Sequence, residues 1–250
     1  MNELPVRYFE GHDGAKLAYR ELGEGRPVVL IHGYFSTATV NWVRYGHAAK
    51  VAERGRRVIM PDLRGHGDSA KPHEPAAYPR DALADDGFAL IDQLGLTDYD
   101  LGGYSLGART TVRMLVRGAR PGRAVVAGMG LSGITDTAHR GDFFRRLLTN
   151  LGTFQRGTPE WSAEAFLRTT KGDPVALLRV LDTFADTTRE ELRRLTLPVL
   201  VLSGVDDHDN GSAEELAGVL PDGRHVAIAG NHMSAVTKPE LGAAIADFLA

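Results

Sequence analysis

Ser105 stands between two glycines, Gly103 and Gly107, directly after a short apolar run and directly before a stretch with helical periodicity. A serine hydroxyl is a weak nucleophile unless it is exposed, oriented and close to a base. A sharp strand-to-helix turn exposes and orients the hydroxyl, and the first N–H groups of the helix can stabilise negative charge that develops beside it. The pattern G-x-S-x-G therefore indicates a nucleophilic serine, although an ordinary glycine-rich turn would have the same spacing.

A serine nucleophile needs a base, usually histidine, and the base needs a carboxylate that fixes its tautomer and stabilises its charged form. Among nine histidines, His232 has the most suitable place, because the segment 230–232 directly follows the expected strand 224–228. Another apolar run, 199–204, is followed by three aspartates that could each be the acid: Asp206, Asp207 and Asp209. The chain order of serine, aspartate and histidine is the order found in enzymes with a G-x-S-x-G turn.

A reaction at a carbonyl also needs two N–H donors that face the oxygen as it becomes negative. Leu106, the residue after the serine, can supply one N–H group. The second donor is expected in the loop 32–36, which follows the apolar run 28–31, with the Tyr34 N–H as the candidate. His32 is an alternative base, but its place at the end of that run favours a structural role in which it bonds the loop backbone.

The elements that must position these side chains alternate between strand and helix along most of the chain. This alternation predicts an α/β fold with a mostly parallel sheet and helices on both of its faces, and the hairpin 6–22 adds antiparallel strands at one edge. Ligands bind at the carboxyl ends of such strands, where Ser105 emerges. We predict buried strands at 28–31, 58–60, 124–128 and 199–203, further strands at 100–103 and 224–228, and helices at 41–54, 81–94, 106–117, 212–220 and 239–249.

The interval 131–195 breaks this alternation, because it holds helical patches and no convincing strand. So long an excursion is better explained as a helical lid over the strand ends than as one crossover, although extra helices beside the sheet are an alternative. We therefore expect a core of residues 1–130 and 196–250 and a lid of residues 131–195. One or two of the lid's large apolar side chains should touch substrate, from the set Phe143, Phe144, Leu147, Phe154, Trp161, Phe166 and Phe184.

The composition excludes several classes of function. The 250 residues are 43% apolar and carry a formal net charge of −3, which argues against a general affinity for nucleic acid or for anionic membranes. The absence of cysteine excludes disulfides, thiolate catalysis and cysteine-bound zinc. Neither a secretory leader nor a run of about 18 apolar residues is visible, so we expect a cytoplasmic protein. The oligomeric state is left open.

Five segments occur in an order that is familiar from one family. They are His32-Gly33-Tyr34 with Trp42, the loop 62–69, the turn 103–107, the segment 204–207, and the segment 230–232 followed by Lys238-Pro239-Glu240. Together they resemble the α/β-hydrolase fold superfamily, in particular its lid-bearing, esterase-like branch, and the resemblance runs along the whole chain. It implies an eight-stranded, mostly parallel sheet flanked by helices, with a small helical lid.

The resemblance also bears on individual residues. The acid of this family stands three residues after the glycine of its segment, which favours Asp207 over Asp206. Family members often carry a proline where Gly211 stands, and the stretch 207–210 is unusually polar. Tyr104 occupies a position in the turn that is frequently histidine, and the loop 64–69 is expected to be structural. Serine at position 105 counts against haloalkane dehalogenases and epoxide hydrolases, which would require aspartate there.

The expected activity is that of a serine hydrolase, a carboxylesterase, acting on a small carboxylic ester through an acyl-enzyme intermediate. Ser105 would be the nucleophile, His232 the base and Asp207 the residue that orients it, and the N–H groups of Tyr34 and Leu106 would form the oxyanion hole. No metal and no cofactor is required, and the expected partner is a small-molecule ester. Carbon–carbon bond hydrolysis and lactone hydrolysis by the same triad are alternatives. A non-catalytic ligand-binding protein is a further one.

Overall fold

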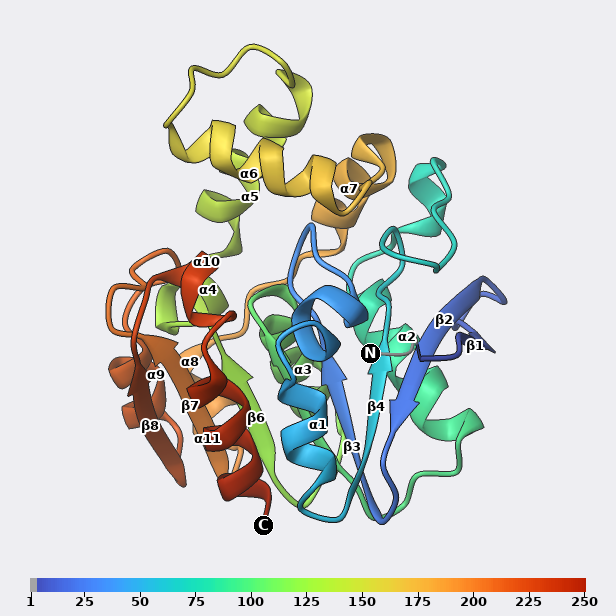
Figure 1. Ribbon diagram of the computed structural model, residues 1–250, viewed down its shortest axis with the longest axis vertical. Coiled ribbons are helices and arrows are strands. Elements are labelled where there is room, and N and C mark those ends of the chain that lie inside the picture. Colours follow the sequence, from blue (N-terminus) through green and yellow to red (C-terminus); the bar gives the residue numbers. More distant parts are fainter. Residues whose placement is uncertain (1–3) are drawn as a thin grey trace.

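The computed structural model describes residues 4–250, and an eight-stranded sheet runs through its centre (Figure 1). The strand order is β1-β2-β4-β3-β5-β6-β7-β8. Strands β1 and β2 form an antiparallel hairpin, β2 pairs antiparallel with β4, and all other pairs are parallel. The predicted sheet is thereby confirmed. Its strands are β1 (Arg7–Glu10), β2 (Lys16–Leu22), β3 (Arg26–Ile31), β4 (Arg56–Pro61), β5 (Asp100–Tyr104), β6 (Ala124–Ala127), β7 (Val199–Gly204) and β8 (Gly223–Ile228).

Helices cover both faces of the sheet and bury its alternating side chains in two separate hydrophobic clusters. Helices α1 (His47–Ala52) and α11 (Pro239–Leu249) pack on one face, against Val28 and Leu30. Helices α2 (Ala82–Gln93), α3 (Leu106–Val116) and α9 (Ala213–Val219) pack on the other, with Val29 and Ile31. Burial on both faces explains why the central strands are continuous apolar runs.

The predicted helix 41–54 is wrong as a single element. The structure has a π-helical turn, η1 (Thr39–Val43), followed by α1. Gly46 separates them with a φ of +78°, a left-handed conformation that ends the first turn. The break lets Asn41 and Trp42 of η1 point into the interior, where both are buried. The other predicted strands and core helices agree with the structure to within about two residues at each end.

The segment 131–195 contains helices and no strand among its residues, all of which are described. They are α4 (Leu131–Thr135), α5 (Thr137–Thr149), α6 (Pro159–Thr169), α7 (Pro174–Val180), the 3₁₀ turn η3 (Leu181–Thr183) and α8 (Arg189–Arg193). Helices α5, α6 and α7 lie above the carboxyl ends of the strands, and we call these three the lid helices (Figure 1). Helices α4 and α8 instead contact α9 beside the sheet. The division into a core and a lid of residues 131–195 stays a prediction, and residues 1–3 of that core lie outside the described part.

The loop 62–69 after β4 is held by buried ion pairs rather than open to a ligand. Arg64 is fully buried and donates to the carboxylates of Asp13 and Asp86. Its guanidinium holds the pKa of Asp13 well below the usual range. His12, Asp13 and Asp86 stand close enough for a metal site, but Arg64 already supplies the positive charge that their carboxylates require.

Two short elements complete the described chain: the 3₁₀ turn η2 (Pro75–Ala77) and helix α10 (His232–Ala235). None of the helices in residues 4–250 combines the length and the apolar character that a membrane crossing demands.

Candidate active site

Ser105 sits on the sharp turn between β5 and α3 with φ +54° and ψ −111°. This is a strained conformation for a residue with a side chain, and such strain is typical of a nucleophile turn. Glycine is required at both flanking positions, because there is no space for a Cβ atom at either one. A Cβ on Gly103 would stand 2.3 Å from the carbonyl carbon of Gly107, and a Cβ on Gly107 would stand 2.0 Å from the carbonyl oxygen of Ile31. The turn therefore admits no larger residue at either position.

The structure brings together three side chains that are distant in the sequence. The Ser105 Oγ lies 3.0 Å from Nε2 of His232, and Nδ1 of His232 lies 2.9 Å from Oδ2 of Asp207. With a neutral imidazole, Nδ1–H donates to the carboxylate and Nε2 accepts from the hydroxyl, which is the arrangement that a general base needs. Ser105 follows β5, Asp207 follows β7 and His232 begins α10, so all three lie at the carboxyl edge of the sheet.

Of the three candidate aspartates, Asp207 is the one whose carboxylate contacts His232. Its side chain is 3% exposed, whereas that of His232 is 11% exposed. Asp206 is exposed, and its backbone N–H donates to the carbonyl of Gly230. Asp209 pairs with Arg140 of helix α5. A buried carboxylate beside an imidazole stabilises the charged form of that imidazole, so Asp207 is suited to orient a base.

The loop after β3 passes directly against the serine turn. A Cβ on Gly33 would lie 3.3 Å from the Cβ of Ser105. The Ser36 N–H donates to the Gly33 carbonyl and closes a tight turn in which Phe35 has φ +59°. Within residues 4–250, neither the Tyr34 N–H nor the Leu106 N–H donates to a protein acceptor. Both groups are therefore free for an oxygen beside Ser105.

Two buried side chains hold this loop in place. His32 donates from Nδ1 to the Gly33 carbonyl over 2.8 Å, and its Nε2 accepts from the Leu63 N–H over 3.0 Å. Burial lowers the pKa of His32, so it stays neutral, and it bonds the backbone rather than Ser105. Asn41 accepts the Gly33 N–H at Oδ1 over 3.0 Å. Sequence reasoning missed Asn41, because only the folded η1 turn brings it to the loop.

Tyr104, the residue before the serine, supports the histidine. Its hydroxyl donates to the backbone carbonyl of His232 over 2.6 Å, and the two ring centroids are 5.5 Å apart. Burial raises the pKa of Tyr104, so the hydroxyl keeps its proton and remains a donor. Tyr104 stands where members of the family frequently have histidine. Its contact with the backbone of His232 gives the tyrosine a structural role at this position.

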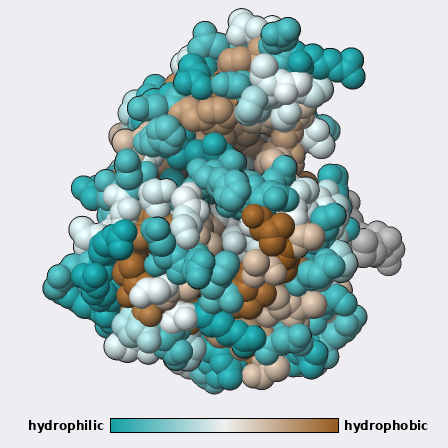
Figure 2. All heavy atoms as spheres, turned by 90° about the vertical axis from the view of Figure 1, so that its left-hand side faces the viewer, coloured by the Kyte–Doolittle hydropathy of each residue, from teal (hydrophilic) through white to brown (hydrophobic). Residues whose placement is uncertain are grey.

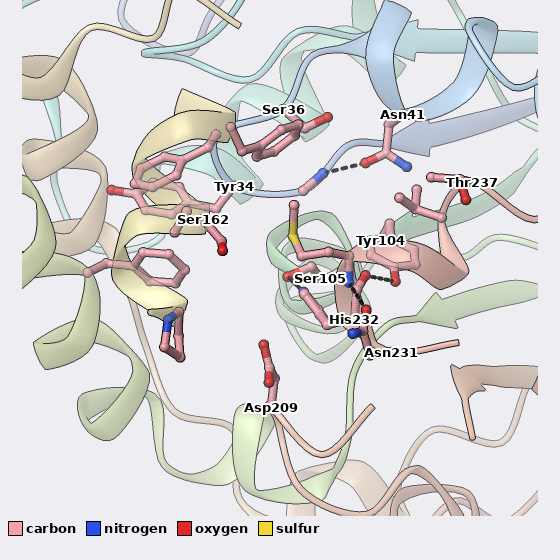
Figure 3. A pocket seen from close by; sticks show the side chains of 18 of the residues that line it. Tyr34, Ser36, Asn41, Tyr104, Ser105, Ser162, Asp209, Asn231, His232 and Thr237 are labelled. Carbon is pink, nitrogen blue, oxygen red and sulfur yellow. Dashed lines mark hydrogen bonds between the residues drawn. The ribbon is translucent and has the colours of Figure 1, made fainter. Parts of the chain in front are cut away.

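A cavity of about 760 Å³ opens beside Ser105 and His232. In Figure 3, Ser105, His232 and Tyr104 lie together on one side, and Ser162 of helix α6 lies across the cavity from them. Apolar side chains border a recess beneath the lid helices in Figure 2.

Three of the seven apolar lid residues that the sequence singled out line this cavity: Phe143, Phe144 and Phe166. Leu147 is buried, Phe184 stacks on Arg109, and neither lines it. Sequence reasoning missed Arg140 and His208, which also line it. The polar character of the stretch 207–210 was the signal for His208, and no local signal marked Arg140.

Comparison with known proteins gives one family. Residues 26–190 match the family model described as the alpha/beta hydrolase fold. The protein YisY of Bacillus subtilis, named as an AB hydrolase superfamily protein, is 32% identical over 111 residues, 44% of this chain and 39% of that protein. The non-heme chloroperoxidase CPO-A1 of Kitasatospora aureofaciens is 28% identical over 225 residues, 78% of this chain and 79% of that protein. The crystal structure of a hydrolase from Pseudomonas aeruginosa has a TM-score of 0.81 at 24% identity and covers 98% of both chains.

These likenesses have limits. The chain spans less than half the length of YisY, and the matched part of a Pseudomonas putida acetyltransferase component is 31% of that protein. Similarity to solved structures at 24% identity shows the fold alone. The names of further similar proteins differ in chemistry: an esterase from Exiguobacterium antarcticum, an enol-lactonase from Burkholderia xenovorans, a 2-hydroxymuconate semialdehyde hydrolase from a Pseudomonas species and an epoxide hydrolase from Siraitia grosvenorii.

Proposed function

The chain belongs to the alpha/beta hydrolase fold family, and on that premise we propose that it is a serine hydrolase that cleaves small carboxylic esters. The observation that carries the proposal is the continuous hydrogen-bonded series from Asp207 through His232 to Ser105, at the wall of a cavity. Serine at position 105 favours an acyl-enzyme route over that of the epoxide hydrolases in the family, which would require aspartate there.

In the proposed reaction, Ser105 attacks the ester carbonyl while Nε2 of His232 accepts the hydroxyl proton. The tetrahedral intermediate places its negative oxygen against the N–H groups of Tyr34 and Leu106, which have no other protein acceptor among residues 4–250. His232 then donates the proton to the leaving alcohol, and an acyl group remains on Ser105. Water, activated by the same imidazole, releases the acid. Asp207 holds His232 throughout, and no step uses a metal or a cofactor.

The cavity supports a substrate of modest size. Its walls combine the aromatic rings of Phe143, Phe144 and Phe166 with the polar groups beside Ser105. The Phe144 ring lies edge-on to Tyr34, with centroids 4.7 Å apart, so this wall is well packed. We therefore expect short to medium acyl groups to bind between the lid helices and the serine turn.

The test combines turnover with covalent labelling. The wild type should hydrolyse p-nitrophenyl acyl esters, and Ser105→Ala should retain the fold and lose the activity. A fluorophosphonate probe should form one adduct, located on Ser105 by peptide mass spectrometry. An unlabelled Ser105 would show that the nucleophile has been assigned wrongly. Tight ligand binding without turnover, unchanged in Ser105→Ala, would instead indicate a non-catalytic binding protein.

A second candidate keeps the triad and cleaves a lactone or a carbon–carbon bond. The observation in its favour is the polar wall of the cavity, where Arg140, His208 and Asp209 face the same space as the lid's aromatic rings. Such a wall suits a substrate with more than one oxygen function. Turnover of lactones or vinylogous diketones, with inactivity toward simple p-nitrophenyl esters, would favour this candidate.

A further inference from the structure

The loop that follows β7 is more elaborate than the proposed reaction requires. We call its stretch 207–210 the acid loop; the four residues of this stretch, Asp207, His208, Asp209 and Asn210, are all polar, and only Asp207 takes part in the proposed triad. The remaining three have no role in proton transfer. The contacts of Asp209 nevertheless connect the triad carboxylate with helix α5 of the lid.

The carboxylate of Asp207 is held at both of its oxygens. Oδ2 faces Nδ1 of His232, and Oδ1 accepts the backbone N–H of Asp209 over 3.3 Å. A carboxylate bound at one oxygen can rotate about its last torsion, whereas one bound at both oxygens is fixed in plane. The orientation of Asp207 toward His232 therefore depends on where the backbone of Asp209 lies.

The backbone of Asp209 is fixed from two sides. On the side of the sheet, the neighbouring Asn210 makes two bonds. Its Nδ2 donates to the carbonyl of Gly128, which follows β6, and its backbone carbonyl accepts the N–H of Gly133 in α4. Toward the lid, the Asp209 carboxylate accepts from Arg140 of helix α5 over 2.7 Å. Figure 3 shows this carboxylate pointing into the cavity. The ion pair with Arg140 is thus the connection between the acid loop and the lid.

Arg140 is itself placed by the residues that line the substrate cavity. Its guanidinium lies 4.9 Å from the ring centroids of both Phe143 and Phe144. Stacking over two rings restricts a long side chain that would otherwise move freely. A change in the packing of either ring therefore reaches Arg140, and through Asp209 it reaches Asp207.

We infer that Arg140 and Asp209 are positioning residues, whose ion pair couples the lid to the orientation of the triad carboxylate. The inference rests on the proposed function, because it assigns these residues a part in the chemistry of Ser105. Full activity then requires helix α5 to be seated, and a substrate that packs on Phe143 and Phe144 favours that seating.

Helix α5 offers a matched comparison. Arg145 pairs with Asp182 of η3 over 2.7 Å, and the two side chains are partly exposed, as are those of Arg140 and Asp209. Neither residue of this second pair bonds to the acid loop. An ordinary surface ion pair contributes little to stability, so both pairs would be equally dispensable if positioning were absent.

The experiment measures kcat and KM for a p-nitrophenyl ester, and the rate of fluorophosphonate labelling, in Arg140→Gln, Asp209→Ala, the double variant and Arg145→Gln. Asp209→Ala keeps the backbone N–H and removes the ion pair. We expect each of the first two variants to lower kcat and the labelling rate about fivefold to tenfold, with KM within about twofold. The double variant should be no slower than either single variant, and Arg145→Gln should match the wild type.

Rates are normalised to the number of sites that the probe titrates, so misfolded protein does not count, and Arg140→Lys should recover part of kcat because it keeps the charge. An unchanged kcat, an equal loss in Arg145→Gln, or a rise in KM alone would overturn the inference while leaving the proposed function intact. A wild type that labels at Ser105 but hydrolyses no ester would overturn the ester activity. In that case, slower labelling in both Arg140→Gln and Asp209→Ala, but not in Arg145→Gln, would still support the coupling. A wild type that does not label would overturn both.

Discussion

The body of the molecule, which is the sheet with the helices that cover its two faces, differs from the lid helices in the burial of some of its ion pairs. The body contains buried charged pairs beside exposed ones: the side chains of Arg56 and Asp100 are 9% and 0% exposed, whereas those of Arg54 and Asp247 are 54% and 64% exposed. In the lid, the pair of Arg146 and Glu160 is 59% and 22% exposed. Buried pairs are costly to break, whereas exposed pairs are weak and screened by salt. If the proposed function is correct, the triad lies on a part of the molecule that contains buried ion pairs, and the residues expected to contact substrate lie on helices with weaker, exposed ones.

The largest expected effect is the loss of a residue of the proposed triad from the body. His232→Ala removes the base, and we expect kcat to fall by roughly 10⁴- to 10⁶-fold, because a serine hydroxyl without a base is a poor nucleophile. No single substitution in the lid helices should approach this effect. Steady-state kinetics on a p-nitrophenyl ester measures it. A lid variant with an equal loss of kcat would contradict the assignment of the chemistry to the body and of substrate selection to the lid.

The two kinds of ion pair should differ in stability. Arg64→Met removes the guanidinium that pairs with the buried carboxylate of Asp86 and leaves it only its contacts with His12, so we expect the free energy of unfolding to fall by about 3–5 kcal/mol. Arg146→Gln in the lid should change it by less than about 0.5 kcal/mol. Urea unfolding followed by circular dichroism gives both values. Equal losses would mean that lid and body are stabilised alike.

Acid should destabilise the body through its buried histidines. His66 is buried, and burial lowers its pKa to about 3, whereas an unfolded histidine titrates near 6.5. Between these values the unfolded chain binds a proton that the folded protein does not. Stability is therefore full above pH 6.5 and falls as the pH falls toward 3, by about 1.4 kcal/mol per pH unit from this residue.

His66→Gln removes that titration, so a plot of unfolding free energy against pH should be less steep for the variant over this range. The wild type and the variant are compared by urea unfolding at several pH values between 6.5 and 4.5. Two parallel curves would show that His66 is protonated in the folded protein.

The smallest effect belongs to the lid and concerns selectivity. Phe144 lines the cavity, so Phe144→Ala should lower kcat/KM for an acetyl ester about tenfold. An octanoyl ester should lose less, because the enlarged cavity admits a longer chain. Trp161→Ala is the matched control, since this aromatic residue lies on helix α6 and does not line the cavity. A preference for chain length that is the same in both variants would place substrate selection outside the lid.

The same contrast explains what could be predicted from the sequence. The body's strands are short and bounded by turn residues, and its candidate site residues follow strand ends, so local patterns located Ser105, His232 and the acid loop. The choice among three aspartates depended on the resemblance to a family, because the carboxylates differ in direction and not in chain position. Gly46, which divides the predicted helix 41–54, had only its permissive backbone as a signal.

The lid offered weaker signals. Its helical patches are amphipathic, but periodicity does not tell whether an apolar face meets the body, another lid helix or a cavity. Phe144 and Phe184 are equivalent in sequence terms, yet one lines the cavity and the other stacks on Arg109. The pair of Arg140 and Asp209 joins residues 69 positions apart. Its proposed effect on Asp207 depends on the hydrogen bond from the Asp209 N–H to the Asp207 carboxylate, which composition cannot reveal.

The most direct test of the central claim is to trap the acyl group during turnover. The protein is mixed rapidly with p-nitrophenyl acetate, quenched in acid and digested, and the peptides are sequenced by mass spectrometry. We expect an acetyl group on Ser105 in the wild type and none on the corresponding peptide of Ser105→Ala. Steady ester cleavage with an unmodified Ser105, or with the acetyl group on another side chain, would contradict the proposal.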